Sequence, residues 1–65
     1  MEYTNSMIRA LIEEHIHSER DRRILCRRLI DGIVFERLAE DEGMSTRQIK
    51  NIVYKYEGIL FRKLH

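Results

Sequence analysis

The chain has 65 residues and no proline, and its three glycines stand at positions 32, 43 and 58. Long proline-free stretches rich in Glu, Arg, Leu and Ile favour helices, because these residues lose little freedom in a helix while proline breaks it. Charged residues make up 35% of the chain and hydrophobic residues 43%, which suits short amphipathic helices and argues against a disordered tail. We therefore expect an all-α fold of three to four helices in a single domain, residues 1–65.

Apolar residues recur at helical spacing in four segments, and local capping signals separate them. Thr4, Asn5 or Ser6 caps the first helix, and Ser18 caps the second. Gly32 and Gly43 suit the left-handed residue that commonly follows the end of a helix. The helices are therefore predicted over residues 5–17, 19–31, 35–42 and 46–64.

The third and fourth segments are joined by residues that suit a tight turn between crossing helices. Ala39 is a small residue for the closest approach, and Gly43 tolerates the positive φ that the turn requires. Ser45 and Gln48 have the spacing of a capping box. The apolar residues that fill the wedge between the two helices are expected to be Leu38, Ile49 and Val53. This pattern predicts a C-terminal helix-turn-helix over about residues 35–57.

The outward face of the fourth helix carries side chains suited to reading DNA bases. Arg and Lys pair with guanine, Asn and Gln pair with adenine, and Thr contacts thymine. An ordinary helical hairpin with a polar surface is the alternative interpretation. The predicted DNA-binding residues are Thr46, Arg47, Gln48, Lys50, Asn51, Tyr54 and Lys55.

The net charge of +1 conceals an asymmetry along the chain. Residues 1–21 contain two basic and five acidic side chains, whereas residues 43–65 contain five basic side chains and one acidic. A basic C-terminal third favours a polyanion such as double-stranded DNA as the partner. A merely solvated basic helix face, or a helical module that binds another protein, remains the alternative.

The segment from Ile24 to Val53 resembles region 4 of bacterial sigma factors and of sigma-like phage regulators. The matching residues are Ile24, Leu25, Arg28, Leu29, Asp31, Gly32, Ile33, Phe35, Glu36, Leu38, Ala39, Glu40, Gly43, Ser45 and Ile49. The resemblance implies a transcription regulator that reads a promoter element. It implies RNA polymerase as a second partner, and base contacts at Thr46, Arg47, Gln48, Lys50 and Asn51.

The chain departs from that family's pattern at two positions. Val34 stands where a Ser or Thr usually caps the third helix, which costs about 1 kcal/mol of helix stability. Glu42 stands where an apolar residue usually precedes the turn glycine, and Met44 is the residue that can fill that space. The chain also lacks the polymerase-core-binding region, so it is not by itself a conventional sigma factor.

The first helix offers a second surface for assembly. Its apolar stripe is Met7, Ile8, Leu11, Ile12 and Ile16. This stripe is expected to cover the core of the domain. Where part of it stays exposed, it favours a homodimer through the first helix.

Other classes of function receive little support from the sequence. Cys26 is the only cysteine, which excludes an intramolecular disulfide and favours the cytoplasm. No apolar run is long enough to cross a membrane, and no signal peptide is evident. His15 and His17 are two residues apart and point to different faces of a helix, so a metal site is not expected. We find no motif of a catalytic or cofactor site, and expect no enzyme.

Overall fold

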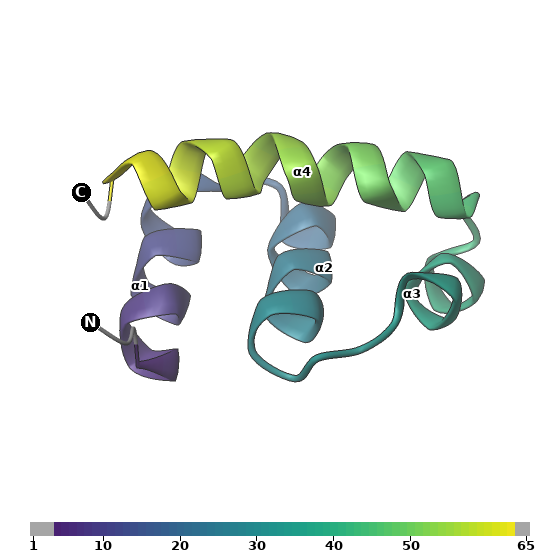
Figure 1. The fold of residues 1–65 in the computed structure, drawn as a ribbon, viewed down its shortest axis with the longest axis horizontal. Helices are drawn as coiled ribbons and strands as arrows, with labels where there is room; N and C mark the ends of the chain where they lie inside the picture. Colours follow the sequence, from purple (N-terminus) through teal and green to yellow (C-terminus); the bar gives the residue numbers. More distant parts are fainter. Residues whose placement is uncertain (1–3, 64–65) are drawn as a thin grey trace.

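The computed structural model describes residues 4–63, which form four α-helices (Figure 1). These are α1 (Asn5–His15), α2 (Glu19–Leu29), α3 (Phe35–Glu42) and α4 (Thr46–Lys63). No strand occurs within the described part of the chain, which confirms the all-α prediction. Leu64, predicted at the end of the apolar stripe of the fourth helix, lies outside the described residues.

The long helix α4 is the one against which the other three helices all pack. It runs across the whole molecule in Figure 1, with α1 beneath its C-terminal half, α2 beneath its middle and α3 beside its start. It packs against each of these helices, while α2 also packs against both α1 and α3. The first turns of α4 are thus anchored mainly by α3.

The core is a cluster of aliphatic side chains to which all four helices contribute. The turn of chain just after α1 adds Ile16. The buried hydrophobic residues are Ile12, Ile16, Ile24, Leu25, Leu38, Ala39, Ile49, Val53 and Leu60. A domain of this size has a small core, so each of these residues carries a large share of the folding free energy.

Helix α1 ends at His15, two residues earlier than the sequence predicted. Ile16 has extended backbone angles, φ −115° and ψ 117°, and its side chain is fully buried. The Arg22 guanidinium donates hydrogen bonds to the backbone carbonyls of Ile16 and Glu13, which satisfies acceptors that the helix end leaves free. The early end lets Ser18 adopt the extended conformation of an N-cap, and its Oγ accepts the Asp21 amide at 3.3 Å.

Helix α2 also ends earlier than predicted, at Leu29 and not near Asp31. The Cys26 carbonyl accepts the amides of both Ile30 and Asp31, at 3.0 and 3.3 Å, so the regular i→i−4 pattern gives way to an i→i−5 bond where the helix ends. Gly32 then takes φ +70°, which confirms its predicted left-handed conformation.

Helix α3 begins without a side-chain cap, as the sequence predicted. Val34 occupies the N-cap position with φ −69° and ψ 153°, and no side chain accepts an amide of the first turn. Its own side chain is 56% exposed, so it contributes little packing.

We expect Val34→Thr to stabilise the protein by about 0.5–1 kcal/mol, because threonine keeps the branched shape and supplies a capping oxygen. Chemical denaturation in urea measures the change in the free energy of unfolding. Val34→Ala, which has no capping group, is the control and should give no such gain. Equal stability of the threonine and alanine variants would contradict the prediction.

Candidate nucleic-acid interface

The turn between α3 and α4 is closed by backbone hydrogen bonds around a left-handed glycine. Gly43 has φ +66° and ψ 33°, and its amide donates to the Glu40 carbonyl at 3.4 Å. The Met44 amide donates to the Ala39 carbonyl at 3.0 Å. Met44 also packs against the core, which is the role the sequence suggested for it. The turn therefore holds the start of α4 in a fixed position beside α3.

The capping box predicted at the start of α4 is confirmed. The Gln48 amide donates to Ser45 Oγ at 3.1 Å, and the Ser45 amide donates to Gln48 Oε1 at 2.9 Å. The bond from Ser45 uses one of the two acceptor positions of the Gln48 side-chain carbonyl and fixes its orientation. A bidentate contact of Gln48 with adenine needs both its carbonyl and its amino group, so it would compete with the cap for the orientation of this side chain.

The wedge between α3 and α4 is filled by the residues that the sequence assigned to it. Leu38, Ile49 and Val53 are fully buried, and Ala39 is 6% exposed. A small side chain at position 39 allows the two helices to approach closely. The packing thus fixes which face of α4 points away from the core.

The outward face of α4 presents most of the predicted DNA-binding residues to solvent. Thr46 is half-buried, and Tyr54 is 56% exposed. Arg47, Asn51 and Tyr54 are spaced by four and three residues, so they lie in one row along the helix. The Lys55 ammonium lies 5.4 Å from the Tyr56 ring centroid. The exposed members of the predicted set are Arg47, Gln48, Lys50, Asn51, Tyr54 and Lys55.

An aromatic and cationic cluster gathers around Phe35, the first residue of α3. The Arg28 guanidinium carbon lies 4.1 Å from the Phe35 ring centroid, and Lys50 Nζ lies 5.7 Å from it. The Tyr54 ring meets the Phe35 ring at a centroid distance of 5.9 Å and an angle of 74°. Nothing in the sequence indicated this cluster, because its members come from three different helices.

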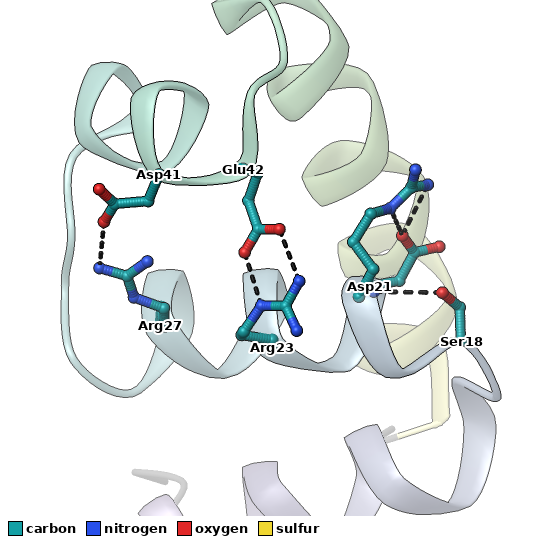
Figure 2. A network of polar contacts seen from close by, with 7 residues as sticks. Ser18, Asp21, Arg23, Arg27, Asp41 and Glu42 are labelled. Atoms are coloured by element: carbon teal, nitrogen blue, oxygen red, sulfur yellow. Dashed lines mark hydrogen bonds and ion pairs between the residues drawn. The ribbon is translucent and has the colours of Figure 1, made fainter.

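Acidic side chains at the end of α3 form ion pairs with arginines of α2 (Figure 2). The Arg23 guanidinium donates to both oxygens of the Glu42 carboxylate, each at 2.6 Å. Arg27 donates to Asp41 at 2.8 Å. The Glu42 side chain is only 7% exposed. An acid is therefore accommodated at position 42, where the sequence pattern called for an apolar residue, because Arg23 neutralises it.

A second set of polar contacts joins the start of α2 to the middle of α4. The buried Asp21 carboxylate accepts the Tyr56 hydroxyl at 3.0 Å and Arg20 Nε at 3.1 Å. Burial, together with the hydrogen bond to Asp21, raises the pKa of the Tyr56 hydroxyl. This link acts together with the core packing to hold the rotation of α4 about its own axis.

The ion pairs between α2 and α3 predict a loss of stability in acid. The hydrogen bond from Arg23 lowers the pKa of Glu42, and the hydrogen bond from Arg27 lowers the pKa of Asp41. A carboxyl group with a lowered pKa stabilises the folded state above its ordinary pKa, about 4, and loses this effect as the pH falls through the lowered value.

We expect the urea concentration at which half of the wild-type protein is unfolded to decrease as the pH is lowered from about 5 to about 2. Glu42→Gln should be less stable at pH 7 and should show a flatter decline in acid, since one of the titrating carboxylates is gone. Glu40→Gln removes an exposed acid of the same helix and is the control. Identical pH profiles for the Glu42→Gln and Glu40→Gln variants would contradict the prediction.

The apolar stripe of the first helix is largely covered. Ile12 and Ile16 are fully buried, while Ile8 and Leu11 are partly buried against the core. Met7 is 39% exposed. The predicted homodimer through this helix would therefore have Met7 as its main exposed apolar contact.

Residues considered for other kinds of site are His15, His17 and Cys26. His15 and Cys26 are half-buried, His17 is exposed, and burial raises the pKa of the Cys26 thiol. Within residues 4–63, no group of three or more His, Cys, Asp or Glu side chains is placed to hold a metal ion, and no pocket is found. None of the described helices has the length and apolar character needed to cross a membrane.

No family model, curated protein or solved structure matches the chain.

Proposed function

We propose that the chain is a small sequence-specific DNA-binding transcription regulator, in which α3, the turn at Gly43 and α4 act as a helix-turn-helix. The proposal has α4 lying in the major groove, which is wide enough to admit a helix. The observation that carries it is the exposed face of α4, on which Arg47, Asn51 and Lys55 stand, in a helix that packs against all three other helices.

The distribution of charge supports DNA as the partner. The arginines of α2 pair with the acids of α3, as in Arg23 with Glu42 and Arg27 with Asp41. Within the described residues, no acid pairs with Arg47, Lys50 or Lys55. The face of α4 thus presents positive charge that is not neutralised by its neighbours, and such charge attracts the phosphates of DNA.

We propose different roles for the predicted residues, according to their places on α4. Arg47 and Asn51 lie in the same row within the first two turns of α4, the part of a recognition helix that contacts base edges. Lys55 lies further along the helix and suits a phosphate contact. The Gln48 carbonyl is held in the capping box, so its main part in the proposal is to fix the start of the helix.

The resemblance to sigma region 4 suggests how such a small domain finds its site. One reading helix covers only a few base pairs, and its few basic residues give weak binding at physiological salt. A second DNA-bound protein raises the effective concentration of the domain at its site. We propose RNA polymerase as that protein. A homodimer through α1 is the weaker alternative, because Met7 is the main apolar side chain that this helix exposes.

Selection of bound sequences from a pool of random DNA duplexes tests the proposal directly. The purified chain, with and without RNA polymerase, is expected to enrich one short sequence. An asymmetric enriched site supports polymerase as the partner, whereas a palindrome supports a homodimer. A chain that enriches nothing in either condition, but binds polymerase, would instead be a protein-interaction module.

We expect Lys55→Ala to weaken binding to all duplexes. Affinity falls as the salt concentration rises, and the steepness of this fall, measured as the slope of log affinity against log salt concentration, should decrease by about one. Arg9→Ala removes the same charge from an exposed position on α1 and should leave the slope unchanged. Titration of a labelled duplex at several salt concentrations measures the affinity and its salt dependence for each variant. Equal slopes for the Lys55→Ala variant and the wild type would rule out a phosphate contact at Lys55.

A further inference from the structure

The ring of Phe35 is the common contact of two side chains on the face of α4. Lys50 and Tyr54 are four residues apart, so they lie one turn apart on the same side of the helix. The distances of 5.7 Å from Lys50 Nζ and 5.9 Å from the Tyr54 ring are those of a cation–π contact and an edge-to-face aromatic pair. One residue of α3 therefore touches two residues of the proposed reading face.

No other described polar contact fixes these two side chains. Neither Lys50 nor Tyr54 makes an ion pair or a side-chain hydrogen bond with the described residues. Both residues are exposed. A free lysine side chain has many rotamers, and fixing one on binding costs affinity.

The Phe35 ring is in turn held by Arg28 of α2. The Arg28 guanidinium carbon lies 4.1 Å from the ring centroid, while its NH1 group donates to the Ile33 carbonyl at 3.0 Å. Phe35 itself is half-buried and packs against the cluster of fully buried core residues without belonging to it. Phe35 therefore contacts surface side chains of α4 in addition to packing α3 against the core.

We propose that Phe35 is a positioning residue, which holds Lys50 and Tyr54 in the conformations that they need for binding DNA. This inference rests on the function proposed above. The aromatic ring lowers the cost of ordering both side chains when α4 binds. A leucine at position 35 would preserve the apolar contact with the core, but it has no aromatic face for the ammonium and no ring for Tyr54.

The contact itself is tested by NMR on the free protein. The ring current of Phe35 is expected to shift the Lys50 Cε protons upfield in the wild type and in Phe35→Tyr. The shift should disappear in Phe35→Leu. Its absence from the wild type would overturn the proposal without reference to DNA.

The effect on binding is tested by a double-mutant cycle with the duplex that the selection enriches. Phe35→Leu should weaken binding by about three- to tenfold, because two side chains then have to be ordered on binding. Phe35→Tyr should bind as the wild type does. In the Lys50→Met background, the effect of Phe35→Leu should fall by at least half, since Phe35 can no longer act through Lys50.

The assay temperature is set below the melting transition of every variant. Phe35→Met replaces Phe35→Leu if the leucine variant is not fully folded there. Independent effects of the Phe35 and Lys50 substitutions, or unchanged binding by Phe35→Leu, would overturn the positioning role while the DNA-binding function stands. A wild-type chain that binds no duplex would overturn the function and the positioning role together, even with the ring-current shift present.

Discussion

Replacing Ala39 with glutamate is expected to leave the protein largely unfolded at 25 °C. Ala39 is 6% exposed where α3 packs against α4, beside the fully buried Leu38. The larger side chain would overpack the joint, and its carboxylate would lose water without gaining a partner. An unpaired buried charge costs several kcal/mol, about as much as the whole stability of a domain this small.

Circular dichroism during thermal denaturation measures this effect. Ala10→Glu is a matched control, because Ala10 is an exposed alanine in the middle of another helix. Its substitution makes the same change in charge and should alter stability by no more than about 0.5 kcal/mol. An Ala39→Glu variant that melts at the same temperature as Ala10→Glu would show that α3 and α4 do not cross at Ala39.

Features set by local chemistry were predictable from the sequence. The range of α3, the left-handed Gly32 and Gly43, and the reciprocal cap of Ser45 with Gln48 all agree with the structure. Each depends on residues no more than a few positions apart. Such interactions depend little on how distant helices pack.

Features set by distant residues were not predictable. Glu42 departs from the pattern of its neighbours, and its partner Arg23 lies 19 positions away. The early end of α1 likewise depends on Arg22, which reaches back from the next helix to the Ile16 carbonyl. A single sequence contains no signal for which arginine meets which acceptor, because that is decided by the packing of the helices.

The candidate site combines both kinds of feature. Helical spacing and the apolar stripe correctly placed Arg47, Lys50, Asn51 and Lys55 on the surface of α4. The same reasoning gave Gln48 both a capping and a reading role, and the structure shows its carbonyl in the cap. It also took no account of the contacts of Lys50 and Tyr54 with Phe35, since these cross from one helix to another.

The loss of sequence discrimination on substituting Arg47 and Asn51 is the second large effect that we expect. Arginine reads guanine and asparagine reads adenine through paired hydrogen bonds, each worth about 1–3 kcal/mol of discrimination. Each alanine variant should therefore lose preference at one or two base pairs of the enriched site, by about five- to 150-fold. Affinity for unrelated duplexes should change less, because phosphate contacts remain.

Gln48→Ala is the informative comparison, because it removes an amide side chain from the first turn of the same helix. Its carbonyl accepts the Ser45 amide, so its loss should lower stability by about 1 kcal/mol and leave base preference nearly intact. Repeating the selection with each variant measures preference at every position. If Arg47→Ala and Asn51→Ala enrich the wild-type sequence unchanged, α4 does not read the bases. If only Gln48→Ala loses preference, the cap opens on binding and Gln48, in place of Arg47 and Asn51, reads the bases.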